Sequence, residues 1–316
     1  MAATTPRIAG GDALDEAVAI LAAGGIVAVP TETVYGLAAR ADRDAAVAAI
    51  YRAKGRPSFN PLIVHVADLA GAELLATLDE RARALAAAFW PGPLTLVVPR
   101  RDDASLAPAV SAGLATVALR CPAHPLLRTL LERCPFPLAA PSANKSGAIS
   151  PTEPAHVAAS LGRAVPLILD GGRCEAGVES TIVALRDGGG WQVLRPGPID
   201  KARIRGILGT ESEVVASTRG IEAPGQLAGH YAPAKPLRLH VREAQADEFL
   251  IGFGEVGGDS TLSAGGDLAE AAARLYRCLW EAEAAPPPRI AVAPVPEQGI
   301  GVAINDRLRR AAHSGS

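Results

Sequence analysis

Cysteine, lysine, aromatic residues and long hydrophobic runs are all scarce in this chain of 316 residues. Its four cysteines (Cys121, Cys134, Cys174 and Cys278) include no CxxC pair, which argues against a zinc or redox site. We therefore expect them to be packing residues. No apolar stretch approaches the roughly 18 residues that cross a bilayer, and the N-terminus has neither a basic start nor a hydrophobic segment. We expect a cytoplasmic protein without membrane contact.

The charge balance argues against a broad surface for nucleic acid. Lys+Arg 31 against Asp+Glu 33 leaves a net charge of −2, and aromatic residues make up only 4% of the chain. This composition predicts neither a wide positive field nor a platform for stacking bases, so any RNA contact is expected to be local, weak or transient. Because lysine is rare, most positive charge is carried by arginine, whose planar guanidinium suits phosphate and carboxylate.

Apolar periodicity predicts a mixed α/β protein. In the first two hundred residues, β-rich runs alternate irregularly with Ala-rich helical stretches, which favours a large twisted mixed sheet over a regular doubly wound one. Strands are predicted at 24–30, 61–66, 94–99, 116–120, 137–144, 166–170, 180–185 and 191–197, and helices at 45–54 and 80–90.

The pattern stops at 209–236, where Gly, Pro and Ser without a sustained period indicate a long connector. Beyond it, strands at 237–241, 249–254 and 290–295 and helices at 267–284 and 303–312 predict a small Rossmann-like βαβ domain. We therefore divide the chain into a large domain over 1–208, a connector or lid over 209–236, and a small C-terminal α/β domain over 237–316.

Common nucleotide-binding and hydrolase motifs receive little support. Gly252, Gly254 and Gly257 form a GxGxxG after a strand, but the next helix begins only near Asp267, which disfavours a dinucleotide site. No lysine follows a glycine, so the chain has no P-loop. HExxH and GxSxG are also absent, so the sequence offers no support for a zinc protease or a hydrolase nucleophile elbow.

Small polar or cationic clusters instead follow the ends of hydrophobic strands. They are PTETVYGLAAR (30–40), KGRP (54–57), FNPLIVHV (59–66), ALRCP (118–122), APSAN (140–144), SGAISPT (146–152), ESTIV (179–183) and LRPG (194–197). Polar side chains at strand ends tend to converge on a cleft rather than on a core.

Each cluster alone has a structural alternative. Lys54 and Arg56 could grip one polyanion from an extended segment, or could simply end a helix favourably. A buried Arg120 needs an anionic partner, which could be a substrate or a structural carboxylate. His65 in an apolar strand is more often a core residue. Together the clusters suit a nucleoside triphosphate beside an amino-acid carboxylate.

These segments, in this order and at these distances, resemble the YrdC-like threonylcarbamoyl-AMP synthase family. The second half, with GHYAPAKP, LIGFG and PEQGIGVAINDRLRRAA, is similar to the longer two-domain members. The resemblance covers nearly the whole chain. It implies a YrdC-like catalytic domain and a nucleotidyltransferase that makes L-threonylcarbamoyl-AMP from L-threonine, bicarbonate or CO₂, and ATP, releasing pyrophosphate. The product would serve threonylcarbamoyladenosine modification of tRNA, passed on to a tRNA threonylcarbamoyl-transfer complex.

The same resemblance implies the site residues. Threonine contacts would fall on Thr33, His65, Arg120, Ala140 and Ser180. ATP contacts would fall on Lys54, Arg56, Asn60, Thr116, Ser142, Asn144, Ser150 and Arg195, with His230 and Tyr231 of the connector folding over the nucleotide. Lys54 and Arg56 would be catalytic, neutralising charge on the phosphates. Mg²⁺ is expected on the ATP phosphates, with no metal site in the protein itself.

Two other functions stay open at this stage. One is a carbamoyl-adenylate-forming carbamoyltransferase like those of hydrogenase maturation, although this chain has none of the extra cysteine pairs expected there. The other is a non-catalytic RNA-binding module. The oligomeric state, the role of the C-terminal domain and the order of carboxylation and adenylation do not follow from the sequence.

Overall fold

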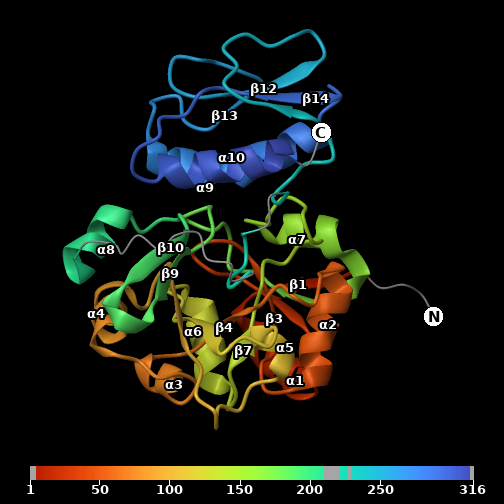
Figure 1. Cartoon of the computed structure of the whole chain (residues 1–316). Coiled ribbons are helices and arrows are strands. Elements are labelled where there is room, and N and C mark those ends of the chain that lie inside the picture. The colour runs from red at the N-terminus through yellow and green to blue at the C-terminus, as the bar shows by residue number, and fades with distance from the viewer. Residues whose placement is uncertain (1–4, 210–220, 227–228, 314–316) are drawn as a thin grey trace.

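A ten-stranded mixed sheet organises the larger part of the protein (Figure 1). The computed structural model describes residues 5–209, 221–226 and 229–313. Across the sheet the strands run β1 (Arg7–Ala9), β8 (Leu167–Leu169), β2 (Val27–Val29), β3 (Gly36–Arg40), β7 (Leu138–Ala139), β4 (Ile63–His65), β6 (Thr116–Arg120), β5 (Leu94–Pro99), β9 (Thr181–Leu185) and β10 (Trp191–Arg195). Parallel and antiparallel neighbours alternate irregularly, as the uneven order of helices and strands predicted.

Helices bury apolar faces against this sheet. They are α1 (Leu14–Ala22), α2 (Asp44–Lys54), α3 (Leu69–Glu73), α4 (Glu80–Phe89), α5 (Pro108–Ser111), α6 (Pro125–Arg133), α7 (Pro154–Leu161) and α8 (Lys201–Leu208). In α2, Val47 and Ile50 are fully buried in the core, and the helix ends at Gly55 in a left-handed conformation (φ 62°). Because the helix ends there, the KGRP segment (54–57) leaves α2 and turns toward the sheet.

The C-terminal part has its own parallel sheet. Its strand order is β11 (Leu237–Arg238), β14 (Arg289–Val292), β12 (Glu248–Gly252) and β13 (Ser260–Thr261), and its helices are α9 (Leu268–Ala284) and α10 (Gly301–His313). Both helices lie between this sheet and the larger part of the protein (Figure 1). The observed fold is thus a large mixed-sheet domain plus a small parallel α/β domain, which confirms the predicted fold class.

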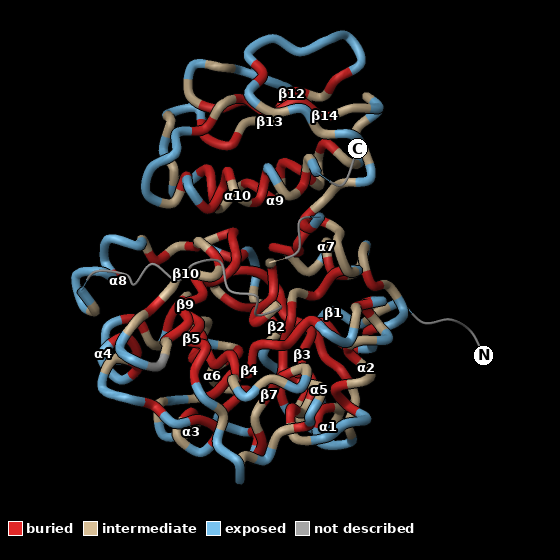
Figure 2. Tube along the Cα trace, viewed as in Figure 1, coloured by how far each residue is buried: buried red, intermediate tan, exposed pale blue. Residues whose placement is uncertain are grey.

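The two parts share a hydrophobic core. Val34, Ile149 and Val178 of the larger part are buried together with Tyr276 and Ile304 of α9 and α10. Figure 2 shows buried residues along the central strands of the large sheet and along both C-terminal helices. The C-terminal domain therefore covers one edge of the larger domain through apolar contact rather than hanging from a linker.

Some predicted elements differ from the observed ones. The strand predicted at 137–144 is only the two-residue β7, because Pro137 and Pro141 flank it and cannot donate to a ladder. Strand β3 was not predicted, since GLAAR has no β-branched residue. The GxGxxG turn folds back on β12, where Phe253 bridges to Val256, and so does not open a helix.

The connector predicted at 209–236 falls partly outside the described residues, which omit 210–220 and 227–228. Within its described residues there is no helix or strand, only an isolated bridge between Ala148 and Ala232. Among the helices of the described part, none combines the length and apolar character needed to cross a bilayer. All four cysteines are buried and free, which confirms their prediction as packing residues.

Candidate functional site

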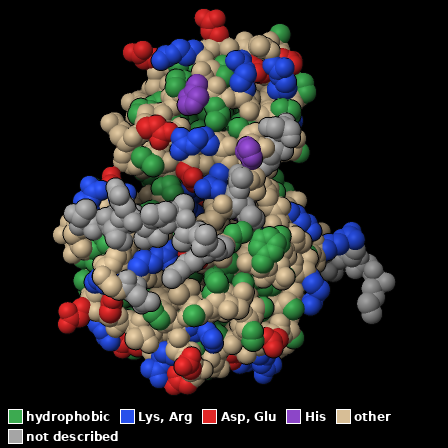
Figure 3. All heavy atoms as spheres, in the orientation of Figure 1, with side chains coloured by type: hydrophobic (Ala, Val, Ile, Leu, Met, Phe, Trp, Pro, Cys, Tyr) green, Lys and Arg blue, Asp and Glu red, His purple; other side chains and the backbone are tan. Residues whose placement is uncertain are grey.

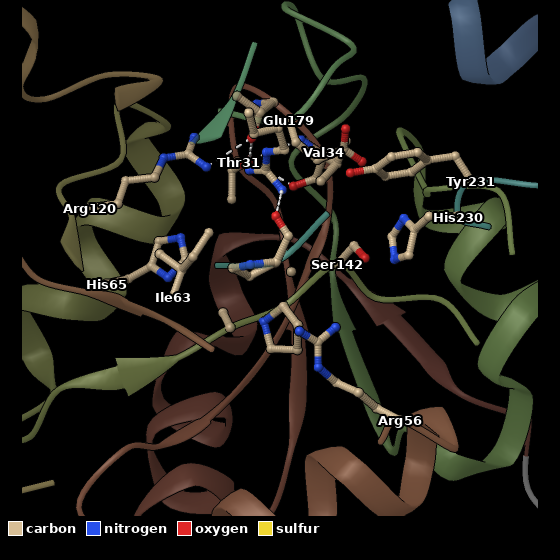
Figure 4. A pocket seen from close by; sticks show the side chains of 16 residues that line it. Thr31, Val34, Arg56, Ile63, His65, Arg120, Ser142, Glu179, His230 and Tyr231 are labelled. Atoms are coloured by element: carbon tan, nitrogen blue, oxygen red, sulfur yellow. Dashed lines mark hydrogen bonds between the residues drawn. The ribbon is translucent and has the colours of Figure 1, made fainter. Parts of the chain in front are cut away.

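One pocket gathers most of the predicted site residues. Nine of them line it: Thr33, Arg56, His65, Arg120, Ala140, Ser142, Arg195, His230 and Tyr231. Figure 4 shows Arg120 and His65 on one side of the pocket and His230 and Tyr231 on the other. Six predicted residues are not among the lining residues: Lys54, Asn60, Thr116, Asn144, Ser150 and Ser180. Thr116 starts β6 and is partly exposed, whereas the other five are buried behind the wall.

A side-chain-stabilised turn presents Thr33 to the pocket. Thr31 Oγ1 accepts hydrogen bonds from the backbone N–H groups of Thr33 (3.0 Å) and Val34 (3.1 Å) and donates to the Val34 carbonyl (2.7 Å). The hydroxyls of Thr31 and Thr33 also lie 2.8 Å apart, and either one could be the donor. In both cases Thr33 Oγ1 keeps a lone pair that can accept another donor.

Arg120 occupies the end of β6 and is held by partners from two segments. Its Nη1 donates to Thr33 Oγ1 (3.0 Å), its Nε donates to the Gly92 carbonyl (3.4 Å), and its Nη2 lies 2.8 Å from Glu32 Oε1. Burial of Glu32 would raise its pKa, but the charge and hydrogen bond of Arg120 outweigh burial and lower it. The sequence analysis gave two possible partners for Arg120, a substrate and a structural carboxylate. Glu32 of the PTETVYG segment is that structural carboxylate.

His65 is a neutral residue of the pocket. It is 3% exposed, and burial together with the Arg120 charge lowers its pKa to about 3. Its Nδ1 has no hydrogen-bond partner among the described residues, although a buried ring nitrogen normally has one. His65 therefore brings an unpartnered polar atom to the pocket beside Arg120, where a small polar ligand could supply the missing bond.

Arg56 is aimed at the pocket by the Asn60–Pro61 segment. Its Nη2 donates to Asn60 Oδ1 (2.6 Å) and to the Pro61 carbonyl (2.9 Å), and its Nε donates to the Asn60 carbonyl (3.2 Å). Burial lowers the pKa of Arg56 to about 10, so the guanidinium stays charged at neutral pH. In this arrangement Asn60 orients the arginine.

Lys54 points into the wall of the site instead of into the cavity. Its ammonium group donates to the backbone carbonyls of Ser142 (2.6 Å) and Asn144 (2.5 Å) and to Asn144 Oδ1 (3.3 Å). Burial, with the nearby charges of Arg56 and Lys145, lowers its pKa well below the usual value. Lys54 therefore holds the PSAN segment that carries Ser142, and its predicted contact with ATP stays a prediction.

Arg195 at the end of β10 anchors Ser180 and the connector. Its Nε and Nη2 donate to the carbonyl and hydroxyl of Ser180, each at 3.0 Å, and its Nη1 donates to the Pro224 carbonyl (3.4 Å). Ser180 Oγ also shares a hydrogen bond with Thr95 (2.8 Å). Arg195 thereby joins the sheet to the connector above the pocket.

The connector covers the pocket with two adjacent rings. His230 and Tyr231 make an edge contact with ring centroids 4.0 Å apart, and Tyr231 has a positive φ of 66°. Burial, together with the charges of Lys54, Arg56 and Arg195, lowers the pKa of His230 to about 3 despite nearby Glu179. A neutral His230 can thus approach the cluster of arginines without adding positive charge.

The sequence analysis missed two carboxylates, Glu179, which lines the pocket, and Glu32, which lies against the pocket residue Arg120. Each already holds an arginine, Glu32 with Arg120 and Glu179 with Arg307. Within the described residues, no cluster of three His, Cys, Asp or Glu side chains could hold a metal ion. Glu32 stands in PTETVYG and Glu179 in ESTIV. In each motif, an acidic residue beside hydroxyl residues was the pattern that could have pointed to the site.

The fold and the pocket define a class of protein. Three arginines, small hydroxyl residues and a neutral histidine enclose one cavity over the ends of sheet strands, an arrangement suited to small anionic substrates. On the face in view, Lys and Arg side chains are interspersed with Asp and Glu (Figure 3). The site therefore belongs to a small-molecule enzyme.

Comparison with known proteins makes the class specific. Residues 19–197 match the family described as Telomere recombination, and residues 199–313 match Threonylcarbamoyl-AMP synthase, C-terminal domain. Threonylcarbamoyl-AMP synthase of Bacillus subtilis is 40% identical over 320 residues, covering 94% of this chain and 92% of the relative. The enzyme of the same name from Pyrococcus abyssi is 37% identical over 314 residues, covering 92% and 91%.

A crystal structure of Pyrococcus abyssi Sua5 complexed with L-threonine has a TM-score of 0.87 to this chain. It is 34% identical, and the match covers 98% of both chains. The chain belongs to the threonylcarbamoyl-AMP synthase family, as the resemblance of its motifs indicated.

Proposed function

We propose that the protein synthesises L-threonylcarbamoyl-AMP from L-threonine, bicarbonate or CO₂, and ATP, with release of pyrophosphate. The observation that carries this proposal is the convergence of Arg56, Arg120 and Arg195 on one pocket. Such a pocket suits a substrate pair with several anionic groups, and threonine with ATP supplies a carboxylate and a triphosphate. Family membership adds the specific product.

Threonine binding is assigned to the Arg120 side of the pocket. The guanidinium would donate to the threonine carboxylate from N–H groups beyond those that face Thr33, Gly92 and Glu32. Thr33 and His65 would contact the rest of the amino acid, Ala140 would contribute its backbone, and Ser180 would close the site behind Arg195. This end has short side chains, which favours a small amino acid.

The chemistry needs orientation more than an activated protein nucleophile. The threonine amine attacks CO₂ to form a C–N bond and loses a proton, which gives an anionic carbamate. A carbamate oxygen then attacks the α-phosphorus of ATP, and the bond from that phosphorus to the bridging oxygen breaks, with pyrophosphate taking the electron pair. Arg56 and Arg195 would offset the charge on the phosphates, and Ser142 would donate a neutral hydrogen bond.

We propose that Mg²⁺ enters with ATP, held by its phosphates. Glu179 at the pocket and Glu32 beside Arg120 both already hold arginines, so these residues fit a nucleotide-borne ion better than an ion bound by the protein. The ion would supply neutralisation of the leaving pyrophosphate. His230 and Tyr231 would exclude water from the mixed anhydride. We further propose that the product is handed to a tRNA threonylcarbamoyl-transfer complex in the cytoplasm.

Substrate dependence of pyrophosphate release tests this function. Purified protein with ATP and Mg²⁺ should release pyrophosphate only when threonine and bicarbonate are both present. Carbamoyl phosphate in place of threonine and bicarbonate should give no release, whereas a carbamoyltransferase would show the reverse. Binding of tRNA without any turnover would support a non-catalytic RNA-binding protein instead.

A further inference from the structure

Arg307 lies in α10 of the C-terminal domain, yet its side chain reaches the wall of the pocket in the larger domain. It is 0% exposed, and its Nε donates to Glu179 Oε2 (2.8 Å) while its Nη2 donates to the Pro196 carbonyl (2.9 Å). The third nitrogen, Nη1, donates to Asp306 (2.7 Å). Every nitrogen of this guanidinium is thus used, and two of them bind the larger domain.

The two segments that Arg307 binds are those that carry predicted substrate contacts. Glu179 directly precedes Ser180, and Pro196 directly follows Arg195. Their backbones are also in close contact, because a Cβ added to Gly197 would lie 2.4 Å from the Thr181 nitrogen and 2.6 Å from the Glu179 oxygen. A shift of one segment would therefore displace the other.

Glu179 collects donors from both domains. Ser150 Oγ of the larger domain donates to its Oε1 (2.6 Å), and the Tyr276 hydroxyl of α9 lies 2.9 Å from Oε2 and 3.1 Å from Oε1. The Trp280 ring nitrogen, also in α9, donates to the Ser150 carbonyl (3.2 Å). Burial opposes the charge of Glu179, but Arg307 and then Arg195 lower its pKa to about 2. The carboxylate is therefore ionised at neutral pH.

Arg307 and Tyr276 of the C-terminal domain also contact the connector. The Arg307 guanidinium lies 5.1 Å from the centre of the Tyr231 ring, and the Tyr276 ring lies 5.9 Å from it. Tyr231 is fully buried between them and the pocket. The C-terminal domain therefore holds the predicted cover of the nucleotide as well as the wall behind it.

We propose that Arg307 and Tyr276 are positioning residues for the ATP side of the site, acting through Glu179. The proposal rests on the proposed function, because it takes Ser150, Arg195 and Tyr231 as ATP contacts. It gives the C-terminal domain a defined task, which is to complete the nucleotide site from outside the larger domain. It also gives a role to the GVAINDRLRRAA segment (301–312), because its buried Arg307 holds the wall of the pocket in place.

Among the predicted threonine contacts, Ser180 alone adjoins a residue that Arg307 binds. Arg120 is held by Glu32 and Gly92, and Thr33 by Thr31, and all of these partners belong to the larger domain. Loss of the Arg307 contacts should consequently weaken binding of ATP and leave binding of threonine nearly unchanged. A general loss of stability would instead weaken binding of ATP and of threonine alike.

Calorimetric titration of the full chain with a non-hydrolysable ATP analogue, and separately with L-threonine, tests this separation. The informative variants are Tyr276→Phe, which removes only a hydroxyl, and the double variant Arg307→Gln with Glu179→Gln, which removes both charges of the buried ion pair. Arg307→Lys tests rescue, since lysine can keep one contact but not both. Arg309→Gln is the matched control, because Arg309 lies in the same helix but pairs with exposed Glu297.

The double variant should weaken the ATP analogue about 10- to 100-fold, as expected for loss of hydrogen bonds to charged groups, and Tyr276→Phe should weaken it less. Arg307→Lys should fall between wild type and the double variant, and Arg309→Gln should match wild type. The Kd for threonine should change less than about threefold in all of them. In turnover assays the KM for ATP should rise accordingly.

Wild-type affinity for the ATP analogue in a folded double variant would overturn the proposal, as would equal weakening of both ligands. If the double variant does not fold, Tyr276→Phe decides the matter, and unchanged ATP affinity would again overturn it. Failure of the proposed function is a separate result. In that case the wild-type protein would bind its ligands but form no threonylcarbamoyl-AMP.

Discussion

The ammonium group of Lys54 lies 2.5 Å from the backbone carbonyl oxygen of Asn144, a residue 90 positions further along the chain. This hydrogen bond joins the end of α2 to the PSAN segment, so one buried cation fixes the loop that brings Ser142 to the pocket. The charge that the sequence assigned to ATP is used, in this structure, to build the wall of the site.

Lys54→Met should therefore destabilise the protein as well as reduce its activity. The variant would leave two buried carbonyls without their donor, and each unsatisfied group is worth about 1–3 kcal/mol. Urea unfolding measures the change in the free energy of unfolding, with exposed Lys145→Met as the control. If Lys54→Met lost activity while its unfolding midpoint stayed that of wild type, the structural role would be wrong and a direct phosphate contact favoured.

Arg56→Ala should act on the reaction rather than on threonine binding. Loss of a charged donor at the phosphates should raise the activation free energy by about 1.5–3 kcal/mol, which is a loss of roughly 10- to 150-fold in rate. Threonine-dependent pyrophosphate release measures this loss, and exposed Arg52→Ala in the last turn of α2, just before Arg56, is the control. A near-normal rate for Arg56→Ala would remove this residue from the site.

Gly225→Ala should disturb the cover of the pocket without removing any polar group. Gly225 has a positive φ of 89°, and a Cβ there would lie 2.7 Å from the Tyr231 hydroxyl and 2.9 Å from Arg195 Cδ. We expect the KM for ATP to rise at least about tenfold with little change in the KM for threonine, measured by steady-state pyrophosphate release. Gly147→Ala, also at positive φ but with no atoms near its Cβ, is the control for backbone strain alone. Equal kinetics for the two variants would contradict a covering role for this segment.

Stability should fall between pH 7 and pH 5 because of two buried histidines. His65 and His230 have pKa values of about 3 in the folded state against about 6.5 when unfolded, so the unfolded chain binds more protons in this interval. The stabilisation is present above pH 6.5 and is lost as pH falls toward 3, which amounts to about 2 kcal/mol per histidine at pH 5.

Chemical unfolding of wild type and His230→Gln at both pH values measures this effect. The variant should lose the part of the pH dependence that His230 contributes, about 2 kcal/mol between pH 7 and pH 5. The pKa values of Glu32 and Glu179 lie below 4.5 and do not contribute in this window. An identical pH dependence in the variant would show that His230 is not buried in its neutral form.

Much of the site could be predicted from sequence because its residues follow strands with strong apolar patterns. Strands β4, β6 and β9 are apolar runs, so the positions of His65, Arg120 and Ser180 at or beside their ends could be inferred. The partners of those residues could not, since Glu32 meets Arg120 only after β2, β3 and β6 assemble in one sheet. Pairing across a sheet leaves no local pattern in the chain.

The contribution of the C-terminal domain to the site could not be predicted from the sequence for a similar reason. Arg307 stands in an amphipathic helix among other arginines, and only its burial against Glu179, 128 positions earlier, distinguishes it from Arg309 and Arg310 on the same helix. Helical periodicity places a residue on a face, but it does not reveal which domain that face will cover.

Direct detection of the product tests the central claim most sharply. Purified protein should be incubated with L-threonine, ¹³C-labelled bicarbonate, ATP and Mg²⁺, and the quenched mixture analysed by mass spectrometry. The account predicts a threonylcarbamoyl-adenylate that carries the label at its carbamate carbon and requires all three substrates. Consumption of ATP without that labelled mixed anhydride, or no turnover by folded protein, would contradict it.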